Sequence, residues 1–172
     1  AFAKHFTKPI EQVFSNSESD ATFRNADAGD LAGLELELRG SLGHLADALD
    51  KFRVAGNLAL MKSTVTLPAT AMLNTSKDRP LYGQSPYVLN LSLEYADPKI
   101  ATIGVLYNVS GARIDDVGIL GLPDVYEQPL HRVDVVATRQ LSKQLNLKLS
   151  MDNILFQKPT LTSGGFTVRT YD

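Results

Sequence analysis

The sequence of 172 residues contains no cysteine, so disulfide bonds, thiolate nucleophiles and cysteine-based zinc sites are excluded. No run approaches 18 consecutive apolar residues, which argues against a membrane-spanning helix but not against membrane-spanning strands, since these alternate in polarity. The 17 basic residues balance 19 acidic ones to give a net charge of −2. A general polyanion-binding surface is therefore not expected, and nucleic acid is not a predicted partner.

Motifs for catalysis are also missing. The histidines His5, His44 and His131 are far apart and lack the spacing of an HExxH or HxH metal site. No GxSxG, GxxxxGK[ST], GxGxxG or SxxK pattern occurs, so we expect no enzyme, no metal and no cofactor. The adjacent carboxylates Asp115 and Asp116 are better explained as a solvated loop than as a calcium site. Chance matches to the N-x-[ST] glycosylation pattern occur at Asn74, Asn90 and Asn108.

What the sequence does contain is a repeated alternation of apolar and polar residues. In residues 87–95, "YVLNLSLEY", two tyrosines and three leucines occupy every second position. Similar alternation occurs in residues 34–39, 103–109, 131–138 and 145–152, which predicts strands with one apolar face. Residues 52–66 alternate less cleanly, with a phase change near Lys62 that a β-bulge would explain. Residues 1–14 give the least clear strand.

The connections between these strands alternate in length. Residues 96–99 and 142–144 are tight turns, and residues 41–51 form a connector with a helical turn. Long polar segments rich in Gly, Pro, Asn and Asp cover residues 15–30, 69–85, 112–129 and 157–172. This order predicts an antiparallel up-and-down meander of about seven strands, with the long loops at one end. Such segregation is typical of transmembrane β-barrels, although a soluble barrel or sandwich with inward leucines has the same alternation.

The polar positions of the strands fall opposite the leucines. In a membrane barrel they face the lumen, where they pair with one another, line a water-filled path or contact an enclosed domain. An Arg or Lys facing lipid at the midplane instead would cost about 2–4 kcal/mol. The ten candidate lumen-facing residues are Glu35, Glu37, Arg39, Asn90, Ser92, Glu94, Arg132, Asp134, Lys148 and Asp152.

Several stretches, taken in order, resemble the C-terminal β-barrel portion of TonB-dependent outer-membrane receptors. They are "FTKPIEQVF", "RNADAGDLAGLELELRGSL", "RPLYGQSPYVLNLSLEY", "ATIGVLYNVSGARI" and "YEQPLHRVDVVATRQLSKQLNLKLSMDNIL". The resemblance covers essentially all of residues 1–172. It implies an all-β, antiparallel up-and-down transmembrane β-barrel in the bacterial outer membrane, of which about seven strands are present. It also implies uptake of metal chelates or other large nutrients.

The chain departs from the family pattern at both ends. It has no plug domain and no TonB-interacting box, and "VRTYD" is reached before the final strand is expected. The partners implied are outer-membrane lipid, the remainder of the same barrel with its plug, TonB acting through that plug, and an extracellular ligand of unknown identity. A partner chain is the alternative means of closing the sheet. Two other functions stay open: an outer-membrane platform for a protein partner without transport, and a soluble lipid-binding β-barrel.

Overall fold

The computed structural model describes residues 1–14 and 21–171. Strands make up 63% of it, and the sheets are antiparallel, so the all-β prediction is confirmed. The helical segments of the described residues are two 3-10 turns, η1 (Leu42–His44) and η2 (Asp47–Leu49), in the connector that was expected to hold a helical turn. Among the described residues no helix is long and apolar enough to cross a membrane.

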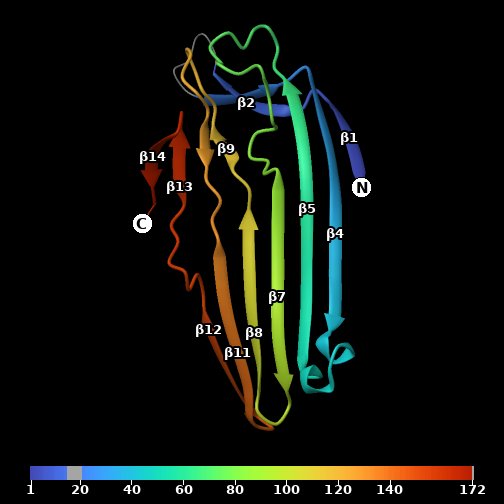
Figure 1. The fold of residues 1–172 in the computed structure, drawn as a ribbon. Helices are drawn as coiled ribbons and strands as arrows, with labels where there is room; N and C mark the ends of the chain where they lie inside the picture. Colours follow the sequence, from blue (N-terminus) through green and yellow to red (C-terminus); the bar gives the residue numbers. More distant parts are fainter. Residues whose placement is uncertain (15–20, 172) are drawn as a thin grey trace.

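Seven strands follow one another across the main sheet, each hydrogen-bonded to the next (Figure 1). In order they are β1 (Phe2–Thr7), β4 (Ala28–Ser41), β5 (Phe52–Thr66), β7 (Tyr87–Asp97), β8 (Ala101–Ser110), β11 (Arg132–Ser142) and β12 (Leu145–Met151). The two-residue β6 (Asp78–Arg79) pairs with the end of β5. The short turns lie at the lower end of the sheet in Figure 1 and the long connections at the upper end, as the meander prediction requires.

The register aligns the apolar positions of neighbouring strands. Leu38 pairs with Gly56, Gly56 with Leu91, and Leu91 with Tyr107. Directly opposed residues of an antiparallel pair point to the same side of the sheet. One face therefore carries the leucines of β5, β7 and β12 together with Leu34, Leu36, Leu38, Val105, Val109, Val133 and Val135. We call this the apolar face. Its side chains are largely uncovered, with Leu38 69% and Leu91 47% exposed, so among the described residues they form no core.

The segments expected to be long loops contain short strands instead. The strands β2 (Ile10–Phe14) and β3 (Ala21–Asn25) pair antiparallel, and we call this pair the β2–β3 hairpin. A four-stranded sheet joins β9 (Arg113–Asp116), β10 (Val125–Glu127), β13 (Thr160–Ser163) and β14 (Phe166–Thr170). Gly164 and Gly165, within the long segment expected over residues 157–172, turn β13 into β14 with positive φ angles that favour glycine. Residues 15–20 and 172 of the expected loops lie outside the described residues.

Residues 1–14 do not form a single strand. Lys8 adopts a positive φ of 55°, and Pro9 follows it without a backbone N–H, so the chain leaves the main sheet after β1 and turns into β2. The β2–β3 hairpin lies across the upper end of the sheet (Figure 1).

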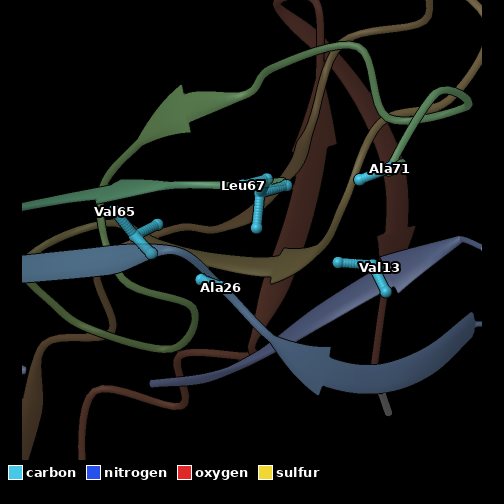
Figure 2. Packing of buried hydrophobic residues seen from close by; sticks show 5 residues of the cluster. All are labelled: Val13, Ala26, Val65, Leu67 and Ala71. Carbon is cyan, nitrogen blue, oxygen red and sulfur yellow. The ribbon is translucent and has the colours of Figure 1, made fainter. Parts of the chain in front are cut away.

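The main hydrophobic cluster lies at this upper end rather than in the middle of the sheet. Val13, Ala26, Val65, Leu67 and Ala71 pack together, with Leu81 against them, where the end of β5 meets the hairpin (Figure 2). We call these six residues the cap core. Val65 is fully buried there, on the side of β5 opposite to Leu60, which is 44% exposed.

The cap core explains the phase change near Lys62. The register of β4 with β5 runs without interruption from Ala28–Thr66 to Ser41–Arg53, so the expected β-bulge is absent from this pair and that prediction is wrong. The apolar residues of β5 change sides because only the last part of the strand is buried, against the cap. The first half contributes to the apolar face, and the last residues turn Ser63 and Val65 toward the cap.

A buried ion pair links the hairpin to β6. The carboxylate of Glu11 lies 3.0 Å from an Nη of Arg79, and both side chains are at most 3% exposed. The other Nη of Arg79 donates to the carbonyl of Gln12 at 2.9 Å, and the backbone N–H of Tyr82 donates to Glu11. Burial raises the pKa of Glu11 above its usual value, although the Arg79 guanidinium acts against this rise.

Candidate ligand-binding face

The face opposite the leucines carries a row of polar side chains that crosses five strands. Glu37 pairs with Asn57, Asn57 with Asn90, Asn90 with Asn108, and Asn108 with Arg132. These residues lie far apart in the sequence, and the strand register alone brings them into line. We call them the amide row. At about 4.8 Å between strands, it is about 19 Å long.

The three asparagines of the amide row are joined by their side chains. Asn90 donates from Nδ2 to Oδ1 of Asn57 at 2.8 Å, and Asn108 donates in the same way to Asn90. A primary amide has two N–H donors and an oxygen with two lone pairs. After these bonds, Asn90 retains one N–H and one lone pair for a further partner.

Charged side chains stand at both ends of the amide row, and each is already paired. Nε of Arg39 lies 2.6 Å from the carboxylate of Glu37 on β4. On β11, Nε of Arg132 lies 3.0 Å from Asp134, which also accepts a hydrogen bond from the backbone N–H of Asn153. Because these ion pairs are largely exposed, their contribution to stability is small. Their main effect is to cancel the charges beside the amide row.

A hollow of about 430 Å³ lies among these groups. Small residues of the central strands lie between the charged pairs, since Ala55 of β5 pairs with both Arg39 and Ser92. Leu106 of β8 pairs with Ser92 and Asp134 and is 44% exposed, so it adds an apolar spot to an otherwise polar face. The residues that line this polar hollow include Glu37, Arg39, Ala55, Asn57, Asn90, Ser92, Leu106, Asn108, Arg132 and Asp134.

The strand register places nine of the ten residues predicted from the sequence on this one face. Six of them line the polar hollow: Glu37, Arg39, Asn90, Ser92, Arg132 and Asp134. Three others lie outside the polar hollow. Glu35 precedes Glu37 on β4 and pairs with Ala59. Glu94 lies 3.3 Å from Arg53 nearer the short turns, and Lys148 of β12 pairs with Thr138. The tenth, Asp152, follows β12 and lies 3.8 Å from Arg132.

Sequence reasoning missed several residues of the polar hollow. Asn57 and Ala55 were not singled out, Leu106 looked like part of an apolar segment, and Asn108 was noticed only for its chance glycosylation pattern. Each stands at a polar-face position of its strand, which alternation does indicate. Their alignment with Asn90 depends on the register between strands, which alternation within one strand does not specify.

Two of the three histidines, His5 and His131, take part in separate pairwise contacts rather than in a shared site. His5 lies 2.8 Å from Asp30, and His131 hydrogen-bonds the Tyr107 hydroxyl at 2.7 Å and stacks on its ring. His131 immediately precedes β11, which begins at Arg132. Within residues 1–14 and 21–171, no three histidine, aspartate or glutamate residues are grouped so as to hold a metal ion.

Comparison with protein-family models, with curated proteins and with solved structures finds no match to this chain. The function therefore has to be argued from the residues of the chain itself.

Proposed function

We propose that the seven-strand sheet is a segment of the wall of an outer-membrane β-barrel, with the apolar face toward lipid and the amide row toward the lumen. The observation that carries this proposal is the exposure of the apolar face. Large side chains such as Leu36, Leu93 and Leu149 are 41–60% exposed on a sheet whose other side carries most of the charged residues of the long strands. On the apolar side, Arg139 lies opposite Leu147 near the short turn that joins β11 to β12. Contiguous apolar patches of this kind mark surfaces that contact a protein or a membrane.

The height of the apolar face supports contact with lipid. From Phe52 to Leu60, β5 spans nine residues, and about 9–11 residues of a strand tilted by about 45° suffice to cross the hydrocarbon layer. Outer-membrane barrels carry an apolar band of about 25 Å between girdles of aromatic residues. At the lower margin the rings of Phe52 and Tyr95 lie 5.1 Å apart, and Tyr87, opposite Leu60, stands at the upper margin. Lys62 and Thr64 continue β5 above that margin as polar residues.

The edges of the sheet support a larger assembly. β1 covers only Ala28–Gly33 of β4, so within the described chain residues 34–41 of β4 lack a partner strand on that side. The outer edge of β12 is likewise unpaired among the described residues. Open strand edges are very costly in lipid, because their backbone groups have no water to bond. We infer that further strands of the same polypeptide close the barrel; a partner chain is the alternative.

The family resemblance narrows the proposal to a TonB-dependent receptor. In that case a plug domain occupies the lumen, TonB supplies energy through the plug, and the protein takes up metal chelates or other large nutrients. The polar face then contacts plug and solute, and the hairpin and small sheet at the upper end belong to the extracellular loops. No residue of the chain is assigned a catalytic role.

Membrane fractionation of the intact native polypeptide tests this function. We expect the polypeptide in the outer-membrane fraction, where alkaline carbonate should not extract it and only detergent should dissolve it. Its intact mass should be several times 18.7 kDa. Uptake of the solute by cells should stop when a protonophore collapses the energy supply on which TonB depends. A polypeptide of about 18.7 kDa that stays in solution without detergent would contradict the barrel. Membrane insertion without energised uptake would contradict transport and would favour the alternative function, an outer-membrane platform for a protein partner.

A further inference from the structure

The charges around the polar hollow restrict what it can bind. Its lining contains two carboxylates, Glu37 and Asp134, and two guanidinium groups, Arg39 and Arg132. Each carboxylate already has an arginine within 3.0 Å, so neither sign is in excess. An anionic or cationic ligand would have to break one of these pairs to be neutralised. A neutral ligand leaves both pairs in place.

The hydrogen-bonding groups between the charges favour hydroxyl ligands. Asn90, at the centre of the amide row, retains a donor and an acceptor side by side after bonding to Asn57 and Asn108. The Ser92 hydroxyl, two residues along β7 on the same face, donates to the backbone carbonyl of Ala55 at 3.4 Å and so offers its lone pairs as acceptors. A ligand hydroxyl group matches this arrangement, because it donates and accepts at one atom.

The size and lining of the polar hollow agree with a small ligand that has both polar and apolar surfaces. Its volume of about 430 Å³ falls within the range of roughly 300–1,000 Å³ that is usual for small-molecule sites. Ala55 leaves room between the flanking ion pairs, and Leu106 offers an exposed apolar surface among polar groups. The C–H face of a sugar ring can pack on such a side chain while its hydroxyls reach the amides.

We propose that the polar hollow is a binding site for a neutral polyhydroxylated ligand, of which a short oligosaccharide is the simplest example. This inference rests on the proposed function, since it narrows the solute of the proposed receptor to neutral sugars rather than charged metal chelates. The site binds by hydrogen bonds from the amide row and by packing on Leu106, and its ion pairs hold the flanking arginines in place.

Saturation-transfer NMR and calorimetry on the intact native polypeptide test the site. The protein is kept in micelles of a detergent without a sugar head group, so that the detergent does not compete. The probes are maltotriose and cellotriose, with N-acetyl-triglycine amide as a neutral peptide and ferric citrate as an anionic chelate. We expect at least one trisaccharide to bind and neither of the other two probes to do so.

Three variants locate the binding. Asn90→Leu removes the central amide, and Ala55→Leu fills the hollow without altering the amide row; each should raise the trisaccharide Kd by about tenfold or more. The control Asn146→Leu removes an amide from the same face on β12, outside the hollow, and should change Kd by less than about twofold. Far-ultraviolet circular dichroism checks that each variant is folded, and Ala55→Leu keeps the test decisive if Asn90→Leu does not fold.

The outcomes separate this inference from the proposed function. A polypeptide that inserts into micelles but binds neither trisaccharide, or binds one with equal Kd in wild type and Ala55→Leu, overturns the sugar site alone. Binding of ferric citrate or the peptide that is lost in Ala55→Leu also overturns it, because the hollow would then accept another class of ligand. Trisaccharide binding by a detergent-free soluble polypeptide would support the site and contradict the membrane barrel.

Discussion

Replacement of Leu91 by arginine distinguishes lipid from water at the apolar face. Leu91 lies at the centre of that face and is 47% exposed. If the face meets water, Leu91→Arg replaces one exposed side chain by another and should change the free energy of unfolding by no more than about 0.5 kcal/mol. If the face meets lipid near the midplane, the same change should cost about 2–4 kcal/mol, which lowers the ratio of folded to unfolded protein by about 30- to 900-fold.

Urea unfolding of the intact native polypeptide in lipid vesicles, followed by circular dichroism, measures this difference. Ser92→Arg is the matched control, because Ser92 is the next residue of β7 and faces the other side of the sheet; we expect its loss to stay within about 0.5 kcal/mol. Leu149→Arg and Ser150→Arg repeat the comparison on β12, where Leu149 lies opposite the uncharged Ala137. Equal losses for the two faces would refute their assignment, and equal tolerance would refute contact with lipid.

Three further predictions concern the sheet and its cap. Gly33→Ala should destabilise the fold by about 1–3 kcal/mol, because a Cβ there would lie 2.5 Å from the Phe2 ring and 2.7 Å from a backbone oxygen, whereas Gly40→Ala has open space and should be tolerated in the same urea titration. Arg79→Leu should lower the free energy of unfolding by about 3–5 kcal/mol, because it leaves the buried carboxylate of Glu11 unpaired. A decrease of less than about 1 kcal/mol would contradict the burial of this ion pair. Part of that loss should return on acidification from about pH 7 to about pH 5. Burial raises the pKa of Glu11 and Arg79 opposes this rise, so the loss of Arg79 raises the pKa of Glu11 further. The stability linked to protonated Glu11 therefore increases as the pH falls through the folded pKa of Glu11 and is lost as the pH rises. A pH-independent deficit would show that Glu11 does not titrate in this range.

The faces of the long strands could be predicted from the sequence because they depend on a local property. Side chains alternate along a strand whatever its neighbours are, so residues such as Leu91 and Ser92 are assigned to opposite faces without knowledge of the fold. The order of short and long connections similarly favours antiparallel neighbours, which is why the seven-strand meander agrees with the sequence prediction.

Features that depend on non-local contacts could not be predicted in this way. The change of face near Lys62 arises because the cap core, assembled from distant parts of the chain, buries Val65. The amide row requires the register between Asn57, Asn90 and Asn108, which no single segment specifies. The short strands of the upper end are only two to five residues long, too short for alternation to distinguish them from polar loops.

The most direct test of the membrane interpretation measures which side chains of β7 touch lipid. These 172 residues contain no cysteine, and any cysteine in the remainder of the intact polypeptide is first replaced by serine. Single cysteines are then introduced at residues 90–93 and labelled with a fluorophore in the polypeptide reconstituted into vesicles. Brominated lipid should quench the label at the positions of Leu91 and Leu93, and aqueous iodide should quench it at the positions of Asn90 and Ser92. Iodide quenching at all four positions, with none by brominated lipid, would contradict a barrel wall in the membrane.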